Sequence, residues 1–415
     1  MSTIQETIYQ MGKQARAAAY RLAQLTSDEK NATLRAMAAA VRQRAPELLA
    51  ANAMDLEAGA AKSLSTAMLD RLMLDEKRIE AMAAGIDQVA TLPDPVGQIL
   101  DSWDRPNGIH IEQVRVPIGT IGIIYESRPN VTADAAVLCF KTGNATILRG
   151  GSEAIHSNRA IAAALASAGA PDHAIQLIPF TDRESVAVLA GMNKWLDLII
   201  PRGGKGLIET VVSLARMPVI KHYDGICHLF ADAETDPEMA VALTVNSKTH
   251  KCGVCNALET LLVHRDIAAD FLPKVAAALR AKQVELRGCE RVRAVLPDVI
   301  PATADDWTTE YLDLILSIKV VDSLEDAVAH INEYGSHHTD VIVSKNSATA
   351  ERFLREVDSA CVFHNVSTRF ADGGEFGFGA EIGISTDKLH ARGPMGLREL
   401  TSYQYRVRGN GQIKG

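Results

Sequence analysis

Two cysteines spaced as C-x-x-C stand in the segment 251–257 (KCGVCNA), directly before an apolar run. No second C-x-x-C and no nearby H-x₃₋₅-H pair completes a zinc site, so we expect no metal, and the context of a thioredoxin-type redox pair is missing. Cations favour the thiolate, the form of cysteine that acts as a nucleophile. Cys255 follows a glycine and has Lys248, His250 and Lys251 close in sequence, which favours a nucleophilic thiol. A buried structural cysteine is the alternative interpretation.

Two glycine-bearing turns each connect an apolar run to a helical pattern, at residues 147–152 (ILRGGS) and 200–206 (IPRGGKG). Glycines at such a turn let a ligand approach the N–H groups of the helix N-terminus, where phosphate binds well. Neither turn has the dinucleotide fingerprint or the P-loop pattern, so each alone is typical of an ordinary connection. Together they favour a dinucleotide site to which Arg149, Arg202 and Lys205 supply charge.

These residues require a scaffold, and the hydrophobic pattern indicates one. Residues 1–90 are rich in helix formers, and residues 26–29 (TSDE) and 181–184 (TDRE) predict capping boxes. Short apolar runs alternate with helical patterns from residue 120, and the alternation returns over 226–386. The first apolar runs are 120–126, 145–150, 175–180 and 196–204. Continuous apolar strands that alternate with helices predict parallel sheets covered on both faces, hence an α/β fold with two doubly wound lobes.

Composition limits the class of protein. The 415 residues include 43 Lys and Arg against 51 Asp and Glu, a net charge of −8, which is unfavourable for a nucleic-acid partner. The N-terminus does not resemble a secretory signal, and no apolar stretch approaches the roughly 20 residues of a membrane span. Six cysteines in such a chain are expected to be reduced thiols. We therefore expect a cytoplasmic protein with no membrane partner.

Long segments throughout the chain carry a resemblance to a known family. They include 115–136 (RVPIGTIGIIYESRPNVTADAA), 141–154 (KTGNATILRGGSEA), 253–264 (GVCNALETLLVH) and 367–386 (STRFADGGEFGFGAEIGIST). Through them the sequence resembles the aldehyde dehydrogenase superfamily and, within it, the gamma-glutamyl phosphate reductase family. The resemblance implies NADPH-dependent reduction of L-glutamyl 5-phosphate to L-glutamate 5-semialdehyde plus phosphate, through a Cys255 thioester. This reaction is the second step of proline biosynthesis from glutamate.

The resemblance also implies roles for individual residues. Cys255 matches the catalytic cysteine, and Asn130 matches an asparagine whose amide forms the oxyanion hole with the backbone N–H of the nucleophile. The cofactor positions are Arg149 at the adenosine ribose or its 2′-phosphate, Gly203 and Gly204 at the turn that approaches the pyrophosphate, and Glu310 at the nicotinamide ribose.

Two departures from other superfamily members are informative. Hydrolytic members carry a general-base Glu in the stretch that corresponds to residues 219–225. In this sequence that stretch reads VIKHYDG and contains no Glu. Without that base water is not activated, which suits an acyl group exchanged with phosphate. Ser152 stands where NAD-preferring relatives often have Glu, and the lost carboxylate favours NADP, although Glu153 follows directly.

Three cations, Arg128, Lys248 and Arg369, lie in motifs near the expected site and are the candidates for binding the substrate phosphate. Cys252 is unusual for the family, and a disulfide between Cys252 and Cys255 that stops the enzyme under oxidation is a hypothesis. Two other functions compete with the reductase. One is an aldehyde oxidiser that releases a free acid, against which the missing Glu argues. The other is a non-catalytic scaffold, against which the retention of Cys255, Asn130 and Glu310 argues.

We expect a cofactor-binding domain over 1–108 and 118–224 and a catalytic domain over 225–400. An oligomerisation flap is expected over 109–117 and 401–415. The last two ranges have the pattern of exposed strands, which are a liability unless paired. In the superfamily such segments add to the sheet of a neighbouring subunit, so we expect a homodimer or larger. A transient contact with glutamate 5-kinase, which makes the labile substrate, is a further partner interpretation.

Overall fold

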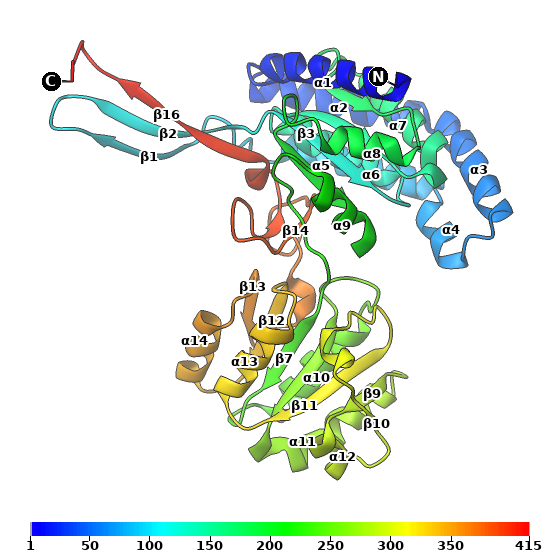
Figure 1. The fold of residues 1–415 in the computed structure, drawn as a ribbon, viewed down its shortest axis with the longest axis vertical. Helices are drawn as coiled ribbons and strands as arrows, with labels where there is room; N and C mark the ends of the chain where they lie inside the picture. The colour runs from blue at the N-terminus through cyan, green and yellow to red at the C-terminus, as the bar shows by residue number, and fades with distance from the viewer. Residues whose placement is uncertain (1, 415) are drawn as a thin grey trace. The chain divides into compact units, whose positions relative to one another are not determined.

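The computed structural model describes residues 2–414 and forms two compact units (Figure 1). Unit 1 contains the chain up to Lys221 together with 378–383 and the residues from 395 onward, and unit 2 contains 222–377 and 384–394. In the described residues, no helix has both the length and the apolar character to cross a membrane. Each unit has its own sheet, as the predicted α/β fold requires.

The N-terminal part of unit 1 is helical, as the helix-forming residues predict. Its helices are α1 (Thr3–Leu22), α2 (Ser27–Gln43), α3 (Ala45–Ala61), α4 (Thr66–Leu72) and α5 (Glu76–Thr91). The capping box at the start of α2 is confirmed. The Thr26 hydroxyl accepts the Glu29 N–H at 3.3 Å, and the Glu29 carboxylate accepts the Thr26 N–H at 2.8 Å. Both terminal N–H groups are thereby satisfied.

The sheet of unit 1 is parallel, with strand order β5-β4-β3-β6, and it confirms the predicted strands. Strands β3 (Thr120–Tyr125), β4 (Ala145–Arg149), β5 (Ile175–Leu177) and β6 (Leu198–Arg202) alternate with α6 (Asn130–Lys141), α7 (Ile155–Ala166), α8 (Arg183–Ala190) and α9 (Lys205–Leu214). Every residue of β3 and β4 is buried, which explains why these strands lack polar alternation.

The second predicted capping box is wrong. Helix α8 begins at Arg183 with Asp182 as its N-cap, and no side chain caps it. The carbonyl of Thr181 instead accepts a hydrogen bond of 2.7 Å from the guanidinium of Arg149. The carboxylate of Glu184, the other half of the predicted box, accepts a hydrogen bond from the Ser2 hydroxyl.

An antiparallel ribbon extends from the rest of unit 1 (Figure 1). Its strands are β1 (Ile99–Asp104), β2 (His110–Pro117) and β16 (Thr401–Arg408), in the order β1-β2-β16. The two segments expected to form a flap therefore pair with each other, in a register that runs from Thr401 opposite Pro117 to Arg408 opposite His110. Tyr403, Tyr405 and Val407 of β16 are 51%, 57% and 58% exposed, so the ribbon keeps apolar surface uncovered.

Unit 2 contains a parallel sheet in the order β10-β9-β11-β8-β7-β12-β13. Its strands are β7 (Cys227–Ala231), β8 (Leu258–His264), β9 (Glu285–Gly288), β10 (Ile300–Pro301), β11 (Ile315–Val321), β12 (Thr339–Val343) and β13 (Cys361–His364). The helices between them are α10 (Pro237–Thr249), α11 (Arg265–Arg280), α12 (Glu290–Val295), α13 (Leu324–Tyr334) and α14 (Ser347–Glu356). Two short strands, β14 (Gly383–Ser385) and β15 (Gly393–Met395), pair where the chain passes between the units.

Candidate active site

The Cys255 backbone is held in the loop between α10 and β8 by its contact with residue 225. A Cβ atom on Gly225 would lie 1.9 Å from the carbonyl oxygen of Cys255, so only glycine fits there. The N–H of Gly225 donates to the carboxylate of Glu310 at 2.9 Å. The thiol of Cys227 donates to the carbonyl of Cys255 at 3.3 Å. Glu310 therefore lies in the immediate surroundings of Cys255, within unit 2.

Cys227, Cys139 and Cys255 differ in burial, and burial decides how readily a thiol becomes a thiolate. Cys227 is completely buried, and burial raises the pKa of its thiol well above the usual value. Cys139 is also completely buried, and burial raises its pKa to about 12. Cys255 is only half-buried and is not part of a disulfide. Since the thiolate is the reactive form, Cys255 is better suited than these two to act as a nucleophile.

Two histidines that the sequence reasoning missed lie beside Cys255. The sulfur of Cys255 and one ring nitrogen from each of His222 and His338 all lie within 4.8 Å of one another. The two rings meet edge to face with centroids 5.6 Å apart. Both histidines stand in segments that carried the resemblance, HYDG and GSHHTD, but nothing in their spacing indicates that they converge on one thiol.

Arg369 is a predicted phosphate-binding cation of unit 2 whose charge interacts with Cys255. Burial lowers the pKa of its guanidinium, and the negative forms of Cys255, Asp372 and Cys227 oppose this shift. Its Nη1 atom is buried and has no hydrogen-bond partner. A buried donor that lacks a partner costs roughly 1–3 kcal/mol. An anion bound beside Cys255 would satisfy it.

Lys248 has a different environment from the one that the sequence predicts. Its side chain and that of Glu259 are both 0% exposed, and the ammonium lies 2.6 Å from the carboxylate. Burial raises the pKa of Glu259 to about 7, against the lowering effect of Lys248. The charge of Lys248 is therefore neutralised inside unit 2, and this placement argues against a phosphate ligand at residue 248.

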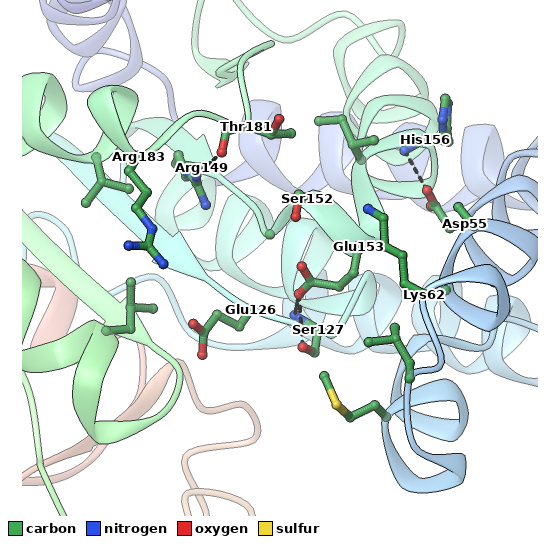
Figure 2. Close-up of a pocket in the computed structure, with 18 of the residues that line it drawn as sticks. Asp55, Lys62, Glu126, Ser127, Arg149, Ser152, Glu153, His156, Thr181 and Arg183 are labelled. Atoms are coloured by element: carbon green, nitrogen blue, oxygen red, sulfur yellow. Dashed lines mark hydrogen bonds between the residues drawn. The ribbon is translucent and has the colours of Figure 1, made fainter.

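Unit 1 has a cavity of about 860 Å³ beyond the carboxyl ends of its strands (Figure 2). Arg149 and Ser152, both predicted at the cofactor, line it. Figure 2 shows Arg149 and Arg183 on one side of the cavity and Lys62 on the other. Arg149 is 8% exposed and donates to Ser185 Oγ at 3.2 Å in addition to the Thr181 carbonyl. The lining combines three cations with three carboxylates, namely Lys62, Arg149 and Arg183 with Asp55, Glu126 and Glu153. The place of the cavity at this end of a parallel sheet suits a dinucleotide.

The glycine turn before α9 lies next to a carboxylate. The N–H of Gly204 donates to Glu126 at 3.1 Å, and a Cβ atom on Gly203 would lie 2.4 Å from the same carboxylate. Helix α9 begins at Lys205, and Gly206 lines the cavity. Glu126 thus takes the position at the helix N-terminus that an anion favours.

Arg128 and Asn130 belong to unit 1, at the start of α6. The side-chain amide of Asn130 donates to Asp134 at 2.8 Å, and burial raises the pKa of Asp134 to about 6. An amide group has two N–H donors, and this bond uses one of them. Glu153, the acidic neighbour of Ser152, is held by the Ser127 backbone N–H at 2.5 Å and hydroxyl at 2.9 Å.

Comparison with known proteins defines the class first. The model of the aldehyde dehydrogenase family matches residues 2–291. The structure of an acetylating aldehyde dehydrogenase from Geobacillus thermoglucosidasius superposes with a TM-score of 0.68 at 17% identity, covering 99% of this chain and 98% of that one, and so shares the fold. The chain belongs to the aldehyde dehydrogenase family, and it is an enzyme of the dehydrogenase and reductase type.

Within that family the chain is similar along its whole length to gamma-glutamyl phosphate reductases. That of Moorella thermoacetica is 58% identical over 407 residues, 97% of each chain. That of Geotalea daltonii is 55% identical over 416 residues, 99% of this chain and 100% of the relative. The crystal structure of the Thermotoga maritima protein superposes with a TM-score of 0.97 at 46% identity, covering 98% of this chain and 99% of that one.

Proposed function

We propose that this protein is an NADPH-dependent reductase that converts L-glutamyl 5-phosphate to L-glutamate 5-semialdehyde and phosphate, in proline biosynthesis. The observation that carries the proposal is the pairing of a half-buried thiol, Cys255, with Arg369, whose buried Nη1 has no partner. A thiol attacks an acyl group, and a guanidinium recognises phosphate or carboxylate. The relatives named for this reaction give the substrate.

The residues of unit 2 account for acyl transfer. The Cys255 thiolate attacks the acyl carbon, a C–S bond forms, and the C–O bond to phosphate breaks. Arg369 favours both the thiolate and the departing phosphate through its positive charge. Reduction leaves a hemithioacetal, whose C–S bond breaks to release the aldehyde and return the thiolate. The Cys255 N–H is a proposed oxyanion donor, and one such donor is typically worth ~2.7–4 kcal/mol.

The cavity of unit 1 fits the cofactor. NADPH, when bound there, supplies the hydride that reduces the thioester. Arg149 and Ser152, which line the cavity, would hold the adenosine 2′-phosphate. The turn at Gly203, Gly204 and Lys205 would hold the pyrophosphate once Glu126 releases the Gly204 N–H. Glu153 is engaged by Ser127, which lessens its repulsion of a 2′-phosphate.

The ribbon of unit 1 supports assembly. Its exposed apolar side chains on β16 and its long paired edge suit addition to the sheet of a second copy of the chain. We propose a homodimer or larger. All six cysteines are free thiols, in keeping with a cytoplasmic enzyme.

The reverse reaction tests the mechanism. Glutamate semialdehyde and NADP are mixed with enzyme, and NADPH formation is followed with and without inorganic phosphate. We expect NADPH formation to depend strictly on phosphate, to be absent in Cys255→Ala and to persist in Cys252→Ala. Full activity without phosphate would mean that water resolves the thioester and that the protein is a hydrolytic dehydrogenase.

A further inference from the structure

The cluster of Cys255, His222 and His338 has the ligand chemistry of a metal site. A thiolate and two imidazoles are donors that zinc prefers, and three protein ligands with one open position is a common zinc arrangement. All three residues belong to unit 2, so one compact unit positions them. Their donor atoms lie within 4.8 Å of one another. A tetrahedral zinc site with these ligands spaces its donors by about 3.3–3.6 Å, so shifts near 1 Å complete it.

The hydrogen bond of His222 fixes its tautomer. Its Nδ1 lies 3.0 Å from the carbonyl oxygen of Ile384. A carbonyl only accepts, so Nδ1 carries the hydrogen, and Nε2 is the ring nitrogen whose lone pair can bind a metal. This is the arrangement of a histidine that binds a metal, since such a residue almost always donates its other ring N–H to a carbonyl or carboxylate.

His338 provides an independent sign of a ligand. Its side chain is completely buried, and its Nε2 atom has no hydrogen-bond partner. Its Nδ1 lies 2.8 Å from the hydroxyl of Thr339, which can accept a hydrogen and leave Nε2 as the donor to a metal. An orphaned ring nitrogen is costly unless something occupies its site.

We propose that Cys255, His222 and His338 bind one zinc ion, and that the bound ion reversibly blocks the nucleophile. On binding, the thiol loses its proton to solvent and the sulfur lone pair is donated to the metal, so that it is no longer available to an acyl carbon. The blocking rests on the proposed function, whereas the metal site does not.

Cobalt is the spectroscopic probe, because a thiolate bound to Co²⁺ gives a charge-transfer band and Zn²⁺ displaces it. The metal-free full-length protein is titrated with Co²⁺ and then with Zn²⁺ against a chromophoric chelator. We expect the band in the wild type and its loss in Cys255→Ser. Loss of an outer partner of a metal ligand costs roughly 10–100-fold in affinity, so His222→Asn and His338→Asn should weaken Zn²⁺ binding at least as much.

Matched controls are adjacent in the sequence. Cys252→Ser changes the other thiol of the C-x-x-C segment. His337→Asn changes the histidine next to His338, at a φ of 59° that asparagine tolerates. Both should keep the band and the Zn²⁺ affinity. Because His338 is buried, circular dichroism checks its variant, and the half-buried His222 carries the test if that variant does not fold.

Different outcomes separate the two proposals. A band that survives Cys255→Ser, or Zn²⁺ affinity unchanged in the folded His222 variant, would overturn the metal site. If the Co²⁺ band is lost in Cys255→Ser but the enzyme shows no phosphate-dependent activity, the metal site is upheld and the proposed function is refuted. In the active enzyme, Zn²⁺ should inhibit and a chelator should restore the rate. Metal binding at the cluster without inhibition would overturn the blocking.

Discussion

The buried pair of Lys248 and Glu259 gives a direct test of whether Lys248 is structural or binds substrate. Both side chains are 0% exposed and their charged atoms lie 2.6 Å apart. Removing one partner of a buried pair typically costs 3–5 kcal/mol, because the other charge is left uncompensated, whereas replacing both with apolar residues is often neutral. We therefore expect Lys248→Met to lose about 3–5 kcal/mol of stability and Lys248→Met with Glu259→Leu to recover most of it.

The pH dependence of that loss follows from Glu259. Its pKa is already raised to about 7 by burial, and removing Lys248 raises it further. In the variant, the protein must keep the Glu259 carboxyl protonated in order to stay folded. The free-energy cost of this protonation increases as the pH rises. Below about pH 7 the wild-type carboxyl is protonated too, so the extra destabilisation of Lys248→Met should grow only above that pH, by up to about 1.4 kcal/mol per pH unit.

Chemical unfolding and steady-state kinetics measure the two roles separately. The control is Lys345→Met, which breaks the surface pair with Asp236 (3.3 Å, side chains 61% and 35% exposed) and should cost at most about 1 kcal/mol. The KM for the acyl phosphate, or for phosphate in the reverse reaction, should stay within about twofold in the folded double variant. If Lys248→Met keeps its stability but raises KM tenfold or more, Lys248 binds the substrate, and the argument from the ion pair is refuted.

Three further results are expected. Ser152→Glu places a carboxylate in the cavity and should lower the NADPH to NADH ratio of kcat/KM at least about tenfold, or 1.4 kcal/mol; an unchanged ratio would move the 2′-phosphate elsewhere. Burial first, and then His228 and Lys319, lower the pKa of His330 to about 3. Stability should therefore be full above pH 6.5 and fall as the pH drops toward 3, and His330→Gln should reduce that slope by up to about 1.4 kcal/mol per pH unit in urea titrations; an identical slope would contradict the burial argument. Tyr405→Lys, at a position 57% exposed on the ribbon, should shift sedimentation toward smaller species, and an unaltered assembly would exclude this face.

The two predicted capping boxes show where local reasoning succeeds. At Thr26 the side chain and backbone of one short segment satisfy each other, so sequence spacing was sufficient. At Thr181 the same spacing failed because the helix begins after Asp182 and the Glu184 carboxylate accepts a hydrogen bond from the distant Ser2 hydroxyl. Competition from a distant donor cannot be read from four residues.

Strand prediction has a similar limit. Strands β3 and β4 are recognisable in the sequence because burial on both faces requires nearly continuous apolar residues. Strands β8 and β11 are recognisable because apolar residues predominate in them. The short strands β9 and β10 and the ribbon strand β1 lack such a pattern. They are strands because neighbouring backbone groups pair with them.

The amino-acid sequence by itself determined the α/β class, the candidate thiol and the glycines around the two sites, because hydrophobic period and residue type act locally. It could not determine which charges are neutralised or which histidines meet Cys255. Lys248 and Arg369 are both cations in motif segments. Lys248 forms an ion pair with Glu259, whereas Arg369 keeps a buried donor without a partner. Burial and pairing depend on residues distant in sequence that only the folded chain brings together, and these decide which side chains are available for chemistry.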